Sequence, residues 1–425
     1  MIHFIDLAMS TRRALKTLSL CVSYLTMGCL DAVRGPTLLD LKDKLNVNLE
    51  EITWILPAFS IGSILGGLIA GIVLEKFESK SFLIISGNQF VMAITAGALT
   101  LCTSLWSMCI VSGMQGATLG ALDAVGTVLC LNIWSGSQYK SDPFVHSLHF
   151  SFALGALLSP LIAAQFLSER FADSALQPYN GKVHIPYLIM SGLCLISALI
   201  NVPFHFDTQN SHPEKETTNG KNEPTSSPTF GYGNWRSFSM LTSLCLFFFV
   251  YVGLEVGYGS FVSTFGVLSL SLSLSRSQSA LVSTFFWSGI ALMRLLACFI
   301  TLRIPPMGLM GMNLILTVTA SGMLVIWGQT SAQWLACISA ILGLGLATVF
   351  ATTFTWLGKM MVITNRMGAM FSIAGSIGAD IFPLIFGQII GLDPSYFQFL
   401  IFGSVMACLL LFALAYQLAR KSIKE

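Results

Sequence analysis

The chain has 425 residues, of which 54% are hydrophobic and 10% are charged, and its formal net charge is +2. A soluble domain carries about 25% charged residues, so this composition excludes an ordinary soluble protein and indicates a chain embedded in a lipid bilayer. The near-neutral charge, with no basic block in the sequence, argues against nucleic acid as a partner.

The sequence contains twelve apolar segments long enough to cross a bilayer as helices, which takes roughly 20 residues each. A polar stretch rich in Pro, Thr, Asn and Lys separates the sixth from the seventh, and its composition is typical of a disordered linker. The sequence therefore predicts an all-α polytopic membrane protein with twelve transmembrane helices: an N-terminal six-helix bundle over 1–206, a cytoplasmic linker over 207–236 and a C-terminal six-helix bundle over 237–425. In chain order the predicted spans are 15–39, 52–74, 82–104, 107–132, 144–167, 185–206, 238–265, 280–301, 308–328, 334–357, 367–390 and 396–418.

The distribution of Lys and Arg sets the expected orientation, because cytoplasmic loops of membrane proteins carry an excess of these residues. With both termini in the cytoplasm, about three times as many of the 22 Lys and Arg residues fall in cytoplasmic segments as in outside loops. We therefore expect a multi-pass protein with cytoplasmic N- and C-termini, and the plasma membrane is the expected compartment.

Two pairs of segments indicate an internal repeat. The segment "GALLSPLIAAQ" from Gly155 matches "GADIFPLIFGQ" from Gly378 without a gap. The segment "FSIGSILGGLIAGIVLEK" from Phe59 matches "FWSGIALMRLLACFITLR" from Phe286, at a slightly larger separation along the chain. Two six-helix halves that are copies in the same orientation are typical of the major facilitator fold.

Charged residues inside the predicted spans are the first functional candidates, because each costs roughly 2.5–3.5 kcal/mol at the bilayer centre. In the major facilitator arrangement they would all lie on helices that line or shape a central pathway. We therefore expect them to face a wet passage or one another. The six residues are Asp31, Arg34, Asp123, Glu255, Arg294 and Asp380.

Ordinary structural roles compete with these functional ones. Asp31 and Arg34 are three residues apart and share a helix face, so a local ion pair would explain both. Arg294 could neutralise Asp380 or another acid as a structural lock. Asp123 has no basic residue nearby in its own predicted helix, and an unpaired carboxyl whose charge depends on its hydration is a natural site for cation coupling.

Polar and aromatic residues on the same faces complete the predicted binding site. His149 lies at the expected depth of Asp123 on the next span and is a candidate for substrate or proton contact. Hydroxyls, carboxylates and aromatic planes suit a sugar, although the same groups also pack helices in lipid. No nucleophile–base pair, nucleotide loop or metal-ligand set appears in the sequence, so we expect no enzyme, metal site or cofactor. The remaining candidates for substrate binding are Tyr251, Glu255, Tyr258, Trp287, Arg294, Thr348, Thr352 and Asp380.

Three stretches resemble one branch of the major facilitator superfamily. They are "GATLGALDAVGT" (116–127), "LHFSFALGALLSPLIAAQFL" (148–167) and "YVGLEVGYGSF" (251–261). The branch includes the sodium-dependent glucose transporter and major facilitator domain-containing protein 4, and it is similar to bacterial fucose permeases. The loop "GIVLEKFESK" (71–80) departs from the usual pattern of the superfamily because its second glycine is lost.

The resemblance implies roles for individual positions. Asp123 falls where fucose permease-like proteins have an acid implicated in proton coupling. Asp31 falls within one residue of an acid near the end of their first span, and it is the second candidate for cation coupling. His149 falls where those permeases place an amide side chain that faces the sugar. The resemblance thus implies symport of a hexose-like sugar with Na⁺ or H⁺ by rocker-switch alternating access.

Two alternatives stay open at this point. The chain could be a facilitator carrier for another small organic solute, or it could be a nutrient sensor that transports nothing. In each case the expected partners are a small molecule and the lipid bilayer, with no obligate protein partner.

Overall fold

The computed structural model describes residues 2–135, 142–168, 181–209, 235–301, 303–361 and 365–423, and no strand occurs among them. Eleven of the described helices are long and apolar enough to cross a membrane. The predicted all-α polytopic class is confirmed, and the chain is a multi-pass membrane protein. The predicted linker over 207–236 lies almost entirely outside the described residues, so the domain boundaries stay a prediction.

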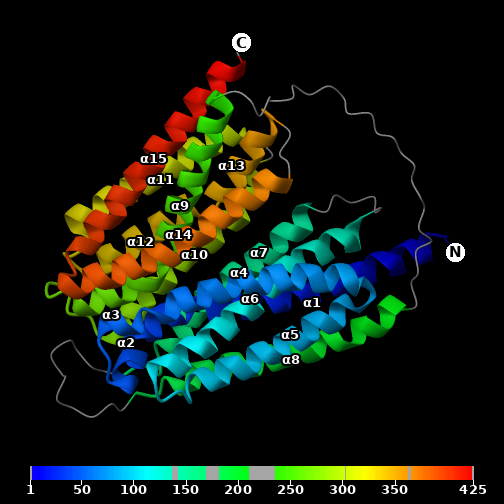
Figure 1. Cartoon of the computed structure of the whole chain (residues 1–425), viewed down its shortest axis with the longest axis horizontal. Helices are drawn as coiled ribbons and strands as arrows, with labels where there is room; N and C mark the ends of the chain where they lie inside the picture. The colour runs from blue at the N-terminus through cyan, green and yellow to red at the C-terminus, as the bar shows by residue number, and fades with distance from the viewer. Residues whose placement is uncertain are drawn as a thin grey trace.

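The helices form two groups that follow one another along the chain (Figure 1). The first group consists of α1 (Ile2–Ala32), α2 (Arg34–Leu45), α3 (Leu49–Ile52), α4 (Ile55–Lys76), the 3₁₀ helix η1 (Glu78–Lys80), α5 (Ser81–Leu99), α6 (Leu105–Trp134), α7 (Asp142–Ala163) and α8 (His184–Gln209). The second group consists of α9 (Trp235–Leu268), α10 (Arg276–Ile300), α11 (Pro306–Trp327), α12 (Ala332–Leu346), α13 (Val349–Gly358), α14 (Asn365–Leu392) and α15 (Tyr396–Ile423).

Each predicted span corresponds to one helix or to two consecutive helices. The first span runs through α1 and α2, which meet at Val33, and the tenth is divided between α12 and α13 at Ala347 and Thr348. α1 is not among the eleven apolar spans, since it carries charged residues such as Lys16 and Asp31. It nevertheless packs along α7 and α8 as part of the first group.

Serine residues mark where two of the long helices begin. The hydroxyl of Ser104 accepts from the N–H of Ser107 at 3.3 Å and starts α6, and the hydroxyl of Ser275 accepts from the N–H of Gln278 at 3.2 Å and starts α10. Each oxygen satisfies an N–H group that has no partner within the first turn of its helix. The two helices therefore begin just before their apolar runs.

Glycine residues allow close helix crossings at equivalent positions within each of the two groups. The equivalence follows the sequence match that aligns Phe59 with Phe286. A Cβ atom at Gly62 would lie 1.9 Å from the carbonyl O of Gly113, where α4 crosses α6. A Cβ atom at Gly289 would lie 2.2 Å from the carbonyl O of Ala340, where α10 crosses α12. The second pair of residues follows the first in the register that aligns Phe59 with Phe286. The α4–α6 and α10–α12 contacts are therefore copies of one packing arrangement.

A second pair of contacts relates α1 to α9. A Cβ atom at Gly155 of α7 would lie 1.9 Å from the carbonyl O of Leu25, and one at Gly378 of α14 would lie 1.9 Å from the carbonyl O of Phe249. Because Gly155 and Gly378 begin the matched segments, Leu25 and Phe249 are equivalent positions. The first span and α9 therefore occupy equivalent places, and this register assigns a counterpart to each residue near the site.

The two groups touch at the end of the molecule that holds α2 and α3, and they lie apart at the end that holds the two chain termini (Figure 1). We call the former the contact end. There a Cβ atom at Gly35 would lie 2.7 Å from the carbonyl O of Gly259, and one at Gly387 would lie 2.3 Å from Cγ2 of Thr53. Side chains could not be inserted at these crossings without separating the two groups.

Candidate functional site

The aspartate in the fourth predicted span lies beside α1 and α7. The Tyr24 hydroxyl of α1 lies 3.0 Å from the carbonyl O of Asp123, 3.3 Å from its Oδ1 and 2.9 Å from Oγ1 of Thr127. The Tyr24 ring meets the His149 ring edge-on, with centroids 6.0 Å apart. Asp123 is exposed at the protein surface, so Asp123, Tyr24 and His149 form one polar cluster of the first group.

A second cluster lies on the other group, around the break between α12 and α13. Glu255 Oε1 of α9 lies 3.6 Å from Nη2 of Arg294 of α10, and the Tyr251 hydroxyl lies 2.7 Å from Glu255 Oε2. The same hydroxyl lies 2.9 Å from the carbonyl O of Leu346, and Arg294 Nε donates to the carbonyl O of Ala347 at 3.4 Å. Carbonyl groups at a helix end have no partner within the helix. Tyr251 and Arg294 therefore supply hydrogen bonds to the carbonyl groups where the tenth span is broken.

One guanidinium joins the two clusters. Arg294 Nη1 donates to the backbone carbonyl O of His149 at 3.3 Å, which is a contact between the two groups of helices. His149 in turn interacts electrostatically with Asp123, and Glu255 does so with Asp31. Asp123, His149, Arg294 and Glu255 therefore form a continuous polar chain across the molecule.

The structure confirms the local ion pair expected from the spacing of Asp31 and Arg34, because Arg34 Nη2 donates to Asp31 Oδ1. Arg294 pairs with Glu255, an acid on the neighbouring helix α9. Asp380 lies on α14 opposite Ser60 of α4, at a contact between the groups, and its Oδ1 is buried with no hydrogen-bond partner among the described residues.

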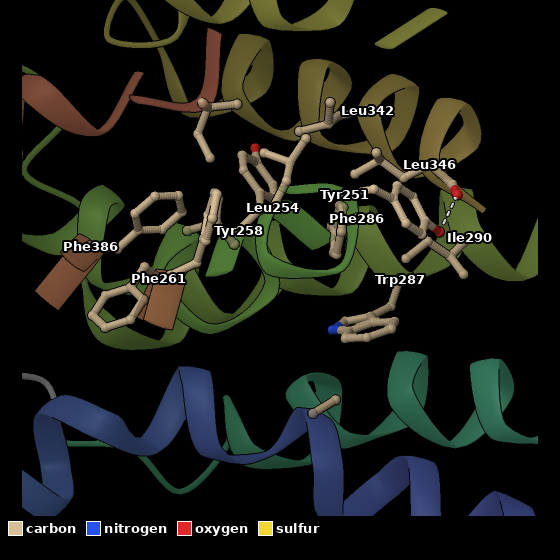
Figure 2. Packing of buried hydrophobic residues seen from close by; sticks show 14 of the residues in the cluster. Tyr251, Leu254, Tyr258, Phe261, Phe286, Trp287, Ile290, Leu342, Leu346 and Phe386 are labelled. Atoms are coloured by element: carbon tan, nitrogen blue, oxygen red, sulfur yellow. Dashed lines mark hydrogen bonds between the residues drawn. The ribbon is translucent and has the colours of Figure 1, made fainter. Parts of the chain in front are cut away.

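Two aromatic candidates differ in their surroundings. Tyr258 is fully buried in the second group, and its hydroxyl lies 2.7 Å from Oγ of Ser339. The Trp287 ring projects from α10 toward the first group (Figure 2), where it meets Phe152 edge-on with centroids 6.3 Å apart. Its buried Nε1 has no hydrogen-bond partner in the part of the chain that the structure describes. Trp287 therefore lies between the groups, whereas Tyr258 lies inside one of them.

The two threonine candidates lie among packed helices, and Thr348 directly follows Ala347, whose carbonyl accepts from Arg294. Asn313 Nδ2 of α11 donates to Thr348 Oγ1 at 2.9 Å, and the Thr348 hydroxyl lies 3.2 Å from Asn313 Oδ1. Thr348 and Thr352 are both buried. Their assignment to substrate binding stays a prediction, and this geometry favours a structural role.

Several residues of the site had no signal in the sequence. Tyr24 lies 99 residues from Asp123, and nothing in its own segment distinguishes it from a core tyrosine. Another cluster lies at the contact end, where Arg276 Nη1 lies 3.4 Å from Asp40 Oδ2 and Arg276 Nη2 lies 2.5 Å from Asp43 Oδ2. Its only signal in the sequence was the two acids that follow the first predicted span. Arg276 Nη1 also donates to Ser168 Oγ at 2.8 Å. This cluster ties α10 to the first group.

Among the described residues, no group of three His, Cys, Asp or Glu side chains is placed to hold a metal ion. The polar chain contains carboxylates, a guanidinium and hydroxyls, and these groups can bind a cation or a polar solute between the two groups of helices.

Comparison with known proteins identifies the architecture. The family model of the Major Facilitator Superfamily matches residues 20–383. The chain belongs to this superfamily. The predicted resemblance is confirmed, and the major facilitator chain is a membrane transporter and not an enzyme.

Named relatives of this major facilitator chain fall in the expected branch. It is 27% identical to sodium-dependent glucose transporter 1 of Danio rerio, covering 96% of this chain and 70% of the relative, and 28% identical to that of Homo sapiens, covering 94% and 79%. It is 21% identical to major facilitator superfamily domain-containing protein 4A of Xenopus tropicalis, covering 95% and 91%.

Solved structures of distant relatives share the fold. A mutant of the nucleoside transporter NupG superposes with a TM-score of 0.67 at 14% identity, covering 94% of this chain and 99% of that one. A bacterial homolog to the human lysosomal transporter Spinster, in an inward-facing and unoccupied conformation, superposes with a TM-score of 0.66 at 14% identity, covering 97% and 98%. At these identities the likeness shows the fold alone.

Proposed function

We propose that this transporter carries a hexose-like sugar together with Na⁺ or H⁺ by alternating access between its two groups of helices. The observation that carries the proposal is the polar chain from Asp123 through His149 and Arg294 to Glu255, which crosses from one group to the other. The relatives named sodium-dependent glucose transporters supply the substrate class and the ion.

Asp123 is the proposed cation site. This exposed residue carries a carboxylate beside the hydroxyls of Tyr24 and Thr127, and hard cations take oxygen ligands of these kinds. A proton would need only the carboxyl, whereas Na⁺ would use the neighbouring oxygens as well. In either case the charge at Asp123 changes next to His149, and His149 contacts the second group through Arg294.

The proposed cycle assigns a state to the structure. With cytoplasmic termini in the plasma membrane, the contact end faces outside and the two groups lie apart on the cytoplasmic side (Figure 1). The structure then represents an inward-facing state. The opposite state requires the contact end to open and the bond from Arg294 to His149 to break or move.

Uptake by proteoliposomes tests the proposal. The purified wild type should concentrate radiolabelled D-glucose when an inward Na⁺ gradient or a proton gradient is imposed, and the gradient that supports uptake identifies the ion. Asp123→Asn should lose concentrative uptake but retain sugar exchange at equal concentrations. Glu255→Gln should lower both by at least about tenfold, since it removes the charged partner of Arg294.

Asp393→Asn is the matched control, because Asp393 is an exposed acid that accepts from the N–H of Ser395 at 2.8 Å outside the polar chain. It should transport like the wild type. Uptake of another solute without uptake of glucose would show that the substrate is not a hexose. Glucose binding without flux would show that the protein is a sensor. Concentrative uptake that survives in Asp123→Asn would remove Asp123 from coupling.

A further inference from the structure

Arg34 is buried at the junction of α1 and α2 with only part of its donor set engaged. Its side chain is 7% exposed, and Nη2 donates to Asp31 Oδ1. The guanidinium carbon lies 3.1 Å from the centre of the Phe59 ring. The buried Nε and Nη1 have no hydrogen-bond partner among the described residues. Buried donors of this kind are rare in native proteins because they are costly.

Gln115 of α6 has the same property. Its side chain is fully buried, and neither its Oε1 nor its Nε2 has a hydrogen-bond partner within the described ranges of the chain. The next residue, Gly116, packs so closely on α4 that a Cβ atom would lie 1.8 Å from the carbonyl O of Phe59. Phe59 therefore lies against Arg34 through its ring and against the residue that follows Gln115 through its carbonyl.

The internal repeat shows that the fold does not require polar groups at these places. In the register that aligns Leu25 with Phe249, the counterpart of Arg34 is Tyr258. In the register that aligns Phe59 with Phe286, the counterpart of Gln115 is Leu342. Tyr258 and Phe286 pack with centroids 4.9 Å apart, and both lie in a buried cluster with Leu342 (Figure 2).

At these two positions the second group has the apolar Leu342 and a tyrosine, Tyr258, whose hydroxyl is paired with Ser339. At the equivalent positions the first group has an arginine and a glutamine whose buried polar atoms lack partners among the described residues. Because packing is achieved without such groups in one copy, Arg34 and Gln115 in the other copy call for polar partners that the described residues do not supply.

The charge balance narrows the ligand's chemistry. Asp31 neutralises Arg34, so Arg34, Asp31 and Gln115 together offer hydrogen-bond donors and an amide without net charge. A neutral molecule with several hydroxyl groups matches this set, because each hydroxyl both donates and accepts. Arg34 also precedes Gly35, whose crossing with Gly259 closes the contact end.

We propose that Arg34 and Gln115 bind hydroxyl groups of a polyhydroxylated substrate and so determine its specificity; this inference rests on the proposed sugar transport. Arg34 donates from Nε and Nη1 to a hydroxyl oxygen, while Asp31 holds its remaining nitrogen. Gln115 accepts a hydroxyl proton and donates to a second oxygen.

The test uses wild type and Gln115→Leu in proteoliposomes with D-glucose and the series of its monodeoxy analogues. In the variant the KM for glucose should rise about tenfold. One deoxy analogue should bind the wild type more weakly than glucose does. The same analogue should bind Gln115→Leu as well as it binds the wild type, because it lacks the hydroxyl that Gln115 contacts. A purely structural role would raise KM for every analogue alike.

Gln89 provides the matched control. It is equally buried, but its amide is fully engaged with Ser23 and Thr26. Gln89→Leu should lower the melting temperature and leave KM unchanged, whereas Gln115→Leu should leave the melting temperature unchanged or raise it, since it removes an unsatisfied polar group. A lower melting temperature in Gln115→Leu, with an unaltered profile across the analogues, would overturn the inference.

Arg34→Lys supplies the second test. It keeps the positive charge beside Asp31 but loses the planar fork of donors, so KM should rise at least about tenfold at unchanged melting temperature. If the wild type transports glucose and both variants retain its KM and analogue profile, the inference fails and the proposed function stands. If the wild type transports no sugar, both fail together.

Discussion

Gly35 of α2 and Gly259 of α9 are equivalent residues of the two repeats, in the register that aligns Leu25 with Phe249, and they lie directly against each other. A Cβ atom at Gly35 would lie 2.7 Å from the carbonyl O of Gly259 and 2.9 Å from that of Ser260. The two halves therefore meet through corresponding parts of their first helices. This crossing of two equivalent glycines closes the contact end. The ion pairs of Arg276 with Asp40 and Asp43 join the two groups at the same end.

Replacing Gly35 by valine should open the contact end. The added carbons would meet backbone oxygens, which cannot rotate away, so α2 and α9 must separate and the opposite state becomes more populated. Spin labels at Asn48 and Leu270, both exposed near this end, should show longer distances in a background cleared of native cysteines. Gly192→Val is the control, because a Cβ atom there would meet nothing within 4 Å. Unchanged distances in Gly35→Val would contradict the closure described here.

Replacing Arg276 by leucine should also release the contact end. Its side chain is 8% exposed and pairs with both Asp40 and Asp43. Removing one partner of a buried ion pair costs about 3–5 kcal/mol, because it leaves buried charge uncompensated. We expect a lower melting temperature and longer label distances, whereas Arg303→Leu, which removes an exposed arginine, should change neither. A variant as stable as the wild type would show that the cluster holds nothing.

The same cluster predicts the response to pH. Burial works against the charged carboxylate of Asp43, but the hydrogen bond and charge of Arg276, with the charge of Lys42, outweigh it and set the pKa of Asp43 below its ordinary value. Because this pKa is lowered, the charged Asp43 stabilises the folded state at pH values above the ordinary Asp pKa of about 3.9. The stabilisation is lost as the pH falls through the pKa of the folded state. The contribution of Asp43 should therefore stay constant from pH 7 to pH 5. Burial raises the pKa of the neighbouring Asp40, against the charge of Arg276, so the distances are measured in Asp40→Asn, where opening between those pH values would refute the assignment.

Replacing Thr348 by valine should affect stability and not substrate binding. The hydroxyl is bonded to Asn313 inside the second group, and such a bond between membrane helices contributes roughly 0.6 kcal/mol, at most about 2 kcal/mol. The melting temperature should fall by a few degrees, while the KM for glucose stays within about twofold of wild type. A tenfold rise in KM at unchanged melting temperature would return Thr348 to the binding site.

Sequence patterns predicted contacts that arise within one helix or within a repeat. The spacing of three between Asp31 and Arg34 predicted their ion pair, because residues three apart share a helix face. The matched segments from Gly155 and Gly378 predicted two copies of one packing arrangement, and both glycines lie against equivalent backbone positions. Such features depend on local geometry, which the chain carries in its order of residues.

Contacts between distant helices were beyond this reasoning. The sequence offered Asp380 or any other acid as a partner for Arg294, and only the crossing of α9 and α10 selected Glu255. Thr348 shows the reverse difficulty. A hydroxyl that packs a helix and a hydroxyl that binds a sugar have the same periodicity, and the proximity of α11 is what distinguishes them.

The sequence by itself determined that this chain crosses the membrane repeatedly and is built from two like-oriented halves, because apolar run length and residue periodicity are properties of order along the chain. The tertiary structure alone decided which charges meet and that Arg294 bridges the halves at His149. It also decided that buried atoms of Arg34 and Gln115 lack partners among the described residues, whereas Tyr258 and Leu342, their counterparts, lie in an apolar core. The physical reason is that a buried polar group is defined by the atoms around it, and those atoms come from helices that are far apart in the sequence.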